Sequence, residues 1–338
     1  MHGDRMGHRG EHPGEPRPGR VPPRRRRRPR VLRTLVLLLV LLLLAAVIAL
    51  VIADQKLDRV DALGPYPGRI ADTPGTNYLL VGTDSRAGLS DEQVADLSTG
   101  GDAGATRTDT IMLLHVSARG NSVLVSIPRD SYVTIPRWGE DKVNAAYSVG
   151  GASLLVETIE LETGVRIDHY AEIGFGGFAE IASAIGGVEV CLESPIVDPL
   201  AGIDLPAGCQ VLSGGDALGY VRSRSTPLAD IDRMNNQRNF LARLARKAGS
   251  PGVVLNPFRS VPVGLALLRS MSVDEGDRIW DTGRIAWSLR GDIPTVSVPY
   301  SGFMDVAGRG NVMLWDEQGA TALWDSIARD APLPEGIE

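Results

Sequence analysis

The fold is organised around residues 107–133, which read RTDTIMLLHVSARGNSVLVSIPRDSYV. Two runs within this stretch, 110–117 and 122–127, are rich in Val, Ile and Leu and are typical of buried strands. The residues between them include Arg119, Gly120 and Asn121, a composition that favours a tight turn. We therefore predict a β-hairpin that belongs to a buried sheet.

Charged residues lie at the open end of this hairpin. Arg107 and Asp109 stand at the start of the first strand, and Arg129 and Asp130 follow the second. Because the start of one antiparallel strand lies beside the end of its partner, we expect these four side chains to meet at one edge of the sheet. They could form a structural ion-pair cluster or a site for phosphate and a divalent cation. The hairpin alone does not separate the two interpretations.

The charge of the chain is unevenly distributed. Residues 1–33 hold 11 of the 35 basic residues and 3 of the 41 acidic residues, so the remainder is strongly acidic. An acidic folded part argues against binding of nucleic acid through a basic surface, and we expect no nucleic-acid partner. Residues 1–30 consist mainly of Gly, Pro, Arg and His, and we predict that they form a disordered, Arg-rich tail.

A long apolar run follows the tail. Leu35–Ala53 is uninterrupted by polar residues, and at about 1.5 Å per residue such a helix approaches the thickness of the hydrocarbon core of a bilayer. A cleaved signal peptide is the alternative, but its apolar region is usually shorter and ends in a small-residue cleavage site. We therefore predict a transmembrane helix over residues 31–53. The basic flank favours a cytoplasmic N-terminus, which places the rest of the chain outside the plasma membrane.

Residues 54–76 contain Asp, Gly and Pro, and we predict a stalk that leads into a domain over 77–338. Strand-like and helix-like segments alternate in this domain, which indicates an α/β fold. Residues 138–144 are expected to be a loop, and residues 250–292 mainly helical. The segments expected to be regular are strands at 77–81, 169–173, 188–192, 295–299 and 312–315 and helices at 145–162, 177–185, 213–221, 230–247 and 317–329.

Cys191 and Cys209 are the two cysteines of the chain. Outside the cytoplasm such a pair is expected to be oxidised to a disulfide. His115 and His169, the two histidines outside the tail, lie in predicted strands and are expected to be structural. A metal site built from Cys and His is therefore not supported.

Several Arg and Asp residues cluster at predicted strand ends and at the start of one helix. Arg binds phosphate through a planar fork of donors, and Asp oxygens suit Mg²⁺, which often keeps one or two carboxylates together with phosphate oxygens. Such a set is typical of a site for a pyrophosphate ligand. The candidates are Asp84, Arg86, Arg107, Asp109, Arg129, Asp130, Arg222, Arg224, Asp230, Arg233 and Gln237.

The order of the motifs resembles that of the LytR-CpsA-Psr family. A basic tail and one membrane helix come first, and several motifs follow in the family's order. They are NYLLVGTDSR (77–86), RTDTIMLLHV (107–116), SIPRDSYV (126–133), KVNAAYSVGG (142–151), IGGVEVCL (185–192), ALGYVRSR (217–224) and DIDRMNNQR (230–238). The resemblance covers roughly residues 77–247.

This resemblance implies a three-layer α/β domain with a central mixed sheet flanked by helices and an apolar cleft for a polyprenyl chain. It implies Mg²⁺-assisted (or Mn²⁺-assisted) transfer of a glycopolymer from a polyprenyl-pyrophosphate carrier to a hydroxyl of peptidoglycan, which leaves a phosphodiester link. By the same resemblance, Asp84 and Asp109 are metal ligands. The residues implied to hold the pyrophosphate are Arg86, Arg107, Arg129, Arg222, Arg224, Arg233 and Gln237.

The resemblance also implies catalytic roles for Arg107, Arg129 and Asp230, with Asp230 as a base or as an orienter of Arg. Asp130 is expected to orient Arg129. Lys142 is a weaker candidate for a residue of the site. One departure concerns Asn236, where family members often have Arg, so a phosphate contact from this position is in doubt.

Two other functions use the same charges. A pyrophosphatase would hydrolyse the lipid pyrophosphate, with water in place of the sugar hydroxyl. A non-catalytic regulator of the envelope, of the transcriptional attenuator type, is the second alternative. Only a short cytoplasmic tail would be available to such a regulator for contact with DNA.

Overall fold

The computed structural model describes residues 30–85, 92, 94, 97, 99, 107–223, 239–244, 246–288 and 293–337. The described chain falls into two units, of which the first ends at Ala49 and the second begins at Leu50. Helix α1 (Arg30–Gln55) supplies the described residues of the first unit. Its segment Leu32–Gln55 has a mean hydropathy of 3.6 in its most apolar window and is long enough to cross a membrane.

The second unit is built on a mixed seven-stranded sheet. In spatial order the strands are β1 (Asp58–Val60), β12 (Met271–Asp274), β7 (His169–Ile173), β2 (Thr76–Thr83), β3 (Thr108–Val116), β4 (Val123–Ile127) and β13 (Thr295–Ser297). The β3–β4 pair is antiparallel, whereas the β2–β7, β1–β12 and β4–β13 pairs are parallel.

The predicted hairpin is β3 and β4, and it lies near the centre of the sheet. Ile111 pairs with Ile127 in this hairpin, and continuing the register places Asp109 opposite Arg129. Strand β2 pairs with the other side of β3 and runs parallel to β7, so β2 and β7 end at the same edge of the sheet. This edge receives the charged residues of the hairpin.

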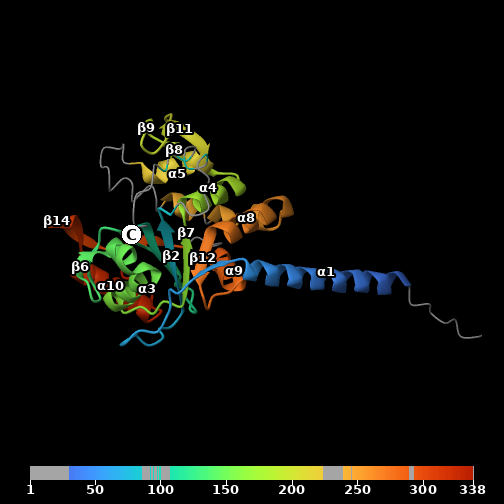
Figure 1. Ribbon diagram of the computed structural model, residues 1–338, viewed down its shortest axis with the longest axis horizontal. Coiled ribbons are helices and arrows are strands. Elements are labelled where there is room, and N and C mark those ends of the chain that lie inside the picture. Colours follow the sequence, from blue (N-terminus) through green and yellow to red (C-terminus); the bar gives the residue numbers. More distant parts are fainter. Residues whose placement is uncertain are drawn as a thin grey trace, which may run out of the picture. The chain divides into compact units, whose positions relative to one another are not determined.

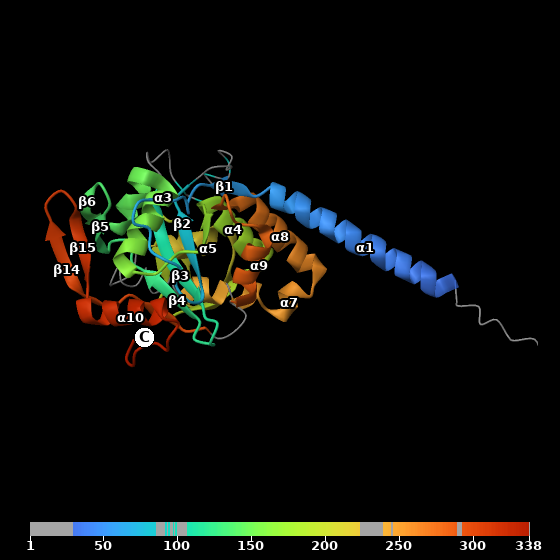
Figure 2. The ribbon, with the colours of Figure 1, turned by 90° about the horizontal axis from the view of Figure 1, so that it is seen from below.

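Helices cover both faces of the sheet, so the domain has the three layers that the family resemblance implied (Figures 1 and 2). On one face lie α3 (Val143–Thr163) and α10 (Glu317–Ala328). On the other lie α4 (Phe175–Ala184), α5 (Gly214–Arg222), α7 (Pro251–Val254), α8 (Pro257–Ser270) and α9 (Ile279–Ser288). The α/β fold with a central mixed sheet is confirmed.

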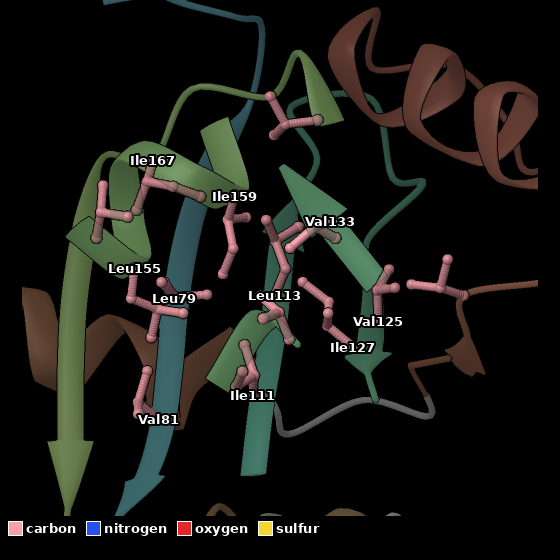
Figure 3. Packing of buried hydrophobic residues seen from close by; sticks show 14 of the residues in the cluster. Leu79, Val81, Ile111, Leu113, Val125, Ile127, Val133, Leu155, Ile159 and Ile167 are labelled. Carbon is pink, nitrogen blue, oxygen red and sulfur yellow. The ribbon is translucent and has the colours of Figure 1, made fainter. Parts of the chain in front are cut away.

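The alternation of side chains along the central strands separates two cores. Leu79, Leu113 and Val125 point toward α3 and pack with Leu155 and other apolar residues, as Figure 3 shows. The intervening residues Tyr78, Met112, Leu114 and Leu124 belong to a different cluster on the opposite face. Both faces of these strands are therefore apolar, as expected for a sheet covered by helices on both sides.

Helix α3 brings one part of the charged edge into place. The helix kinks at Gly151, where φ is 67°, and it ends at Gly164 in the left-handed conformation. The residues that precede it form a hairpin of β5 (Tyr132–Ile135) and β6 (Gly139–Lys142), where the sequence predicts a loop. Lys142 is the N-cap residue of α3 and therefore lies beside the end of β4.

Three smaller strand pairs complete the domain. Cys191 and Cys209 lie directly opposite each other in one of them and form the predicted disulfide. The pairs are β8 (Val188–Leu192) with β11 (Gly208–Leu212), β9 (Ile196–Asp198) with β10 (Ile203–Leu205), and β14 (Tyr300–Val306) with β15 (Gly310–Trp315).

The fold differs from the sequence-based expectation in two segments that contribute short strands to the sheet. Strand β1 lies within the segment for which composition predicts a stalk, and Arg69 of the same segment forms an ion pair with buried Glu160. Strand β12 lies within the segment predicted to be mainly helical. Both strands are short, so their pairing partners in the sheet decide their conformation rather than any local periodicity.

Candidate functional site

The candidate site begins where β2 ends. The backbone N–H of Asp84 donates to the carbonyl oxygen of Arg107 (3.0 Å), and the N–H of Arg107 donates to Oδ1 of Asp84 (2.7 Å). The adjacent residue Ser85 lies against Gly174, where a Cβ would approach the carbonyl oxygen of Ser85 to 2.9 Å. The absence of a side chain at Gly174 therefore lets the ends of β2 and β7 approach closely beside Asp84.

A β-bulge presents Asp109 at this edge. Thr110 pairs with Gly82, but Thr108 pairs with Thr83, so Asp109 is the extra residue of β3. Bulges commonly redirect a side chain near a functional site. Nη1 of Arg129 donates to Oδ1 of Asp109, and the hairpin register places these two residues opposite each other.

Arg129 links two carboxylates, and a second cation shares one of them. Its Nε lies 3.3 Å from Oδ2 of Asp130, and Nζ of Lys142 lies 2.8 Å from Oδ1 of Asp130. Burial alone would lower the pKa of Arg129, but Asp109 and Asp130 outweigh burial and raise it. Burial alone would raise the pKa of Asp130, but Lys142 and Arg129 outweigh burial and lower it. Arg129 and Asp130 are therefore both charged at neutral pH.

A carboxylate that the sequence analysis did not single out lies on the neighbouring strand. Oε2 of Glu172 accepts hydrogen bonds from the hydroxyls of Tyr147 (2.8 Å) and Tyr170 (2.6 Å). Burial, followed by the charge of Glu172, raises the pKa of Tyr147, and the charge of Asp84 adds a smaller effect in the same direction. The available sequence signal was Glu172 inside an otherwise apolar strand that ends at the site edge.

A cavity of about 250 Å³ opens at the same edge, and its walls are almost entirely apolar. It lies between the sheet face that carries Leu80 and Met112, opposite to α3, and the helices that cover this face. Asp109 and Arg222 are the charged residues among its described lining. The guanidinium carbon of Arg222 lies 4.8 Å from the ring centre of Phe175, and Nη1 donates to the carbonyl oxygen of Leu97 (3.4 Å). The cavity is thus an apolar space with charged groups at its border.

Further apolar lining comes from strands β2, β3 and β7 and from the helices. Representative residues are Leu80, Met112, Ala171, Phe178, Leu218, Leu241, Leu244, Ala248, Val263, Leu267 and Ile285.

The structure thus brings together Asp84, Arg107, Asp109, Arg129 and Asp130 with Lys142, and it places Arg222 at the border of the cavity. The other sequence-predicted site residues lie outside the described residues. They are Arg86, Arg224, Asp230, Arg233 and Gln237, together with Asn236.

The arrangement is suited to a ligand that has an apolar part and an anionic part. Arg groups beside an apolar cavity can neutralise a phosphate, and the planar fork of Arg matches phosphate oxygens. The carboxylates of Asp84 and Asp109 supply oxygen ligands of the kind that Mg²⁺ prefers. A structural ion-pair cluster alone would not require a cavity at its border.

Comparison with known proteins adds three similarities. The profile described as the LytR_cpsA_psr family matches residues 51–309. The chain is 54% identical over 275 residues to "Probable cell wall biosynthesis protein LcpB" of Corynebacterium glutamicum, with 81% of this chain and 66% of that protein covered. It is 37% identical over 153 residues to "Polyisoprenyl-teichoic acid--peptidoglycan teichoic acid transferase TagU" of Enterococcus faecalis, with 44% and 50% covered.

Among solved structures, a "LytR-Csp2A-Psr enzyme from Actinomyces oris" matches with a TM-score of 0.64 at 21% identity, covering 80% of this chain and 96% of that one. This likeness supports the fold. The chain spans about two thirds of the length of the corynebacterial relative, 66%, and 50% of the enterococcal one. Since the family profile matches most of the chain and includes the charged edge and the cavity, the chain belongs to the LytR_cpsA_psr family.

Proposed function

We propose that the protein transfers a glycopolymer from a polyprenyl-pyrophosphate carrier to a hydroxyl of peptidoglycan, forming a phosphodiester link. The observation that carries this proposal is that the apolar cavity adjoins the charged edge. Asp109 lines the cavity and is also paired with Arg129 at the charged edge. A lipid pyrophosphate has the same two parts, a long apolar chain and an anionic head. The names of the corynebacterial and enterococcal relatives, a cell wall biosynthesis protein and a teichoic acid transferase, support the same reaction class.

Two carboxylates fit a divalent cation. Among the contacts to described residues, the side chains of Asp84 and Asp109 are engaged through Oδ1 of each, so a second oxygen of each is available for a metal. Mg²⁺ typically takes one or two carboxylates and completes its shell with water and phosphate oxygens. Asp84 and Asp109 would hold Mg²⁺ or Mn²⁺, which would supply charge neutralisation at the transferring phosphoryl group.

The cationic residues have separate tasks in this proposal. Arg129 is held by Asp109 and Asp130, so its guanidinium is oriented before the substrate arrives. Arg222 would contact the phosphate next to the lipid, because it borders the cavity. Arg107 would contribute to charge neutralisation near Asp84. Phosphoryl transfer depends mainly on such positioning and charge stabilisation.

The reaction also assigns a location and partners. Helix α1 would anchor the chain once in the plasma membrane, with the basic N-terminal tail in the cytoplasm and the domain outside. The donor lipid would reside in the same membrane, and the acceptor would be peptidoglycan. The oxidised Cys191–Cys209 pair is consistent with an exterior location.

The test is an in vitro transfer assay with the full chain in phospholipid vesicles, a short lipid-pyrophosphate glycan and peptidoglycan oligomers. We expect a glycan-linked peptidoglycan product that requires Mg²⁺ or Mn²⁺ and decreases in Asp84→Asn and Asp109→Asn. Release of a free phosphorylated glycan without a linked product would instead identify a pyrophosphatase. Metal-independent turnover, or no product with several donors, would contradict the proposed mechanism.

A further inference from the structure

Helices α7, α8 and α9 expose large apolar side chains. Phe258 is 88% exposed, Leu255 78%, Trp287 68% and Trp280 60%. Scattered exposed apolar residues are common, but several on adjacent helices mark a surface that contacts another apolar phase. Figure 2 shows the three helices together on the same side of the sheet.

Helix α8 carries apolar residues on two sides. Val263 and Ala266 are buried in the domain. Phe258, Val261 and Leu265 are exposed and follow one another at spacings of three and four residues, so they form a stripe on the outer side. A helix that is apolar on both sides is normally buried on both sides.

Helix α9 repeats this arrangement. Trp280 and Trp287 are seven residues apart, two turns of the helix, and both are exposed. Ile285 of the same helix lines the cavity, as Leu267 of α8 does. Ile285 and Leu267 pack against one apolar cluster, so the two helices form a continuous wall of the cavity.

The start of α9 is tied to the end of the membrane-length helix. The backbone N–H of Ile279 donates to Oδ1 of Asp54 (2.8 Å), and Nη1 of Arg278 lies 3.5 Å from Oδ2 of Asp54. Asp54 and Gln55 are the last residues of α1, where a spanning helix emerges from the hydrocarbon core. Trp280 follows directly after Ile279, so it lies at the level where Trp is enriched in membrane proteins, the boundary between lipid and water.

Basic residues accompany the apolar ones. Arg259, Arg269, Arg278 and Arg284 are exposed on α8 and α9 or at their ends, whereas Glu275 is the exposed acidic residue within the same described stretch, 257–288. The side chains of Arg269 and Arg284 are each 69% exposed. The bias is positive although the chain outside its N-terminal tail is acidic, and it favours anionic lipid headgroups.

We propose that the outer side of α7, α8 and α9 is a docking surface for the bilayer that α1 crosses. The exposed aliphatic and aromatic side chains insert at the lipid boundary, and the Arg side chains contact the headgroups. An interfacial helix of this kind buries its apolar side by several ångströms, while its charged residues remain at headgroup level.

Docking has a consequence for the donor, which rests on the proposed function. Because the wall of the cavity would face acyl chains on its outer side, a polyprenyl chain could pass between bilayer and cavity without crossing bulk water. Burial of each methylene group is favourable, so exposing a long apolar chain to water during transfer would be very costly. Membrane docking itself does not depend on the reaction and is measured separately.

The test uses the full chain in vesicles of phosphatidylcholine and phosphatidylglycerol whose acyl chains carry bromine, which quenches Trp fluorescence at short range. We expect quenching in the wild type and loss of most of it in Trp280→Phe/Trp287→Phe, which keeps an aromatic ring at both positions. Trp138→Phe is the matched control, because Trp138 is 47% exposed on the β5–β6 hairpin, packed on the other face of the sheet.

Two outcomes would overturn the proposal. In the first, the double variant retains the wild-type degree of quenching, so that neither tryptophan is near lipid. In the second, the two tryptophans respond to the protein-to-lipid ratio but not to bromine, so that the surface binds a second copy of the chain. Quenching that is normal in a variant without transfer activity, such as Asp109→Asn, would support docking even if the proposed reaction proved incorrect.

Discussion

Replacing Arg129 by Lys separates charge from geometry at the candidate site. The Arg129 side chain is 21% exposed and holds Asp109 through Nη1 and Asp130 through Nε. Lys preserves the charge, but its ammonium is a point charge that does not reproduce the planar fork. Asp130 would keep Lys142 as a partner, whereas Asp109 would lose the group that orients it.

The expected magnitude follows from the loss of one oriented, charge-assisted hydrogen bond. Such a bond contributes about 1.5–3 kcal/mol, and at this partial exposure we expect the lower part of that range. If the loss falls on the transition state, kcat/KM for glycan transfer decreases roughly 10- to 50-fold. The assay is initial-rate transfer at varied donor concentration, with thermal unfolding measured in parallel.

Arg137→Lys is the matched control. Arg137 also forms a bidentate pair with a carboxylate, with Nη1 and Nη2 at 2.8 and 2.5 Å from the oxygens of Glu157, but it is not part of the charged edge. We expect transfer by this variant to match the wild type. The argument would be refuted if Arg129→Lys retained full activity, or if both variants lost activity to the same extent.

Three further predictions concern the cavity, the disulfide and pH. Ala248→Trp, at the cavity wall, should raise KM for a long-chain donor more than for a short-chain donor, measured in the same transfer assay. Replacing Cys191 and Cys209 by Ser should lower the free energy of unfolding by about 3 kcal/mol in urea titrations, because the unfolded chain is no longer cross-linked; an unchanged midpoint would contradict this. Burial alone would lower the pKa of His169, but the hydrogen bond and charge of Asp277 outweigh it and raise the pKa. The stabilisation is therefore present below the unfolded-state pKa of about 6.5 and is lost as pH rises through the higher folded-state value; Asp277→Asn should remove this pH dependence of unfolding.

Features that depend on neighbouring residues in the chain could be predicted from the sequence. The apolar run at Leu35–Ala53, the hairpin around Gly120 and the kink at Gly151 all follow from local composition and backbone preference. The hairpin also predicted that Arg107, Asp109, Arg129 and Asp130 lie at one edge of the sheet, whereas the register that places Asp109 opposite Arg129 comes from the structure. The ordered motifs also predicted the family.

Features whose interacting partners are distant in sequence depend on the tertiary structure. Strands β1 and β12 are too short to show a period, and they are extended because they pair in the sheet. Tyr147 and Glu172 meet across 25 positions, and no local pattern indicates that contact.

The family resemblance implied an apolar cleft, but the residues that line the cavity and those on the outer side of α8 could not be identified from the sequence. The sequence does not distinguish the apolar residues Val263 and Phe258, although Val263 is buried in the domain and Phe258 is 88% exposed. Which side of a helix packs against the sheet, and which side stays exposed to solvent or lipid, depends on how the helix packs in the domain. Packing energy is shared among residues from many segments, so it is a property of the assembled domain rather than of any stretch within it.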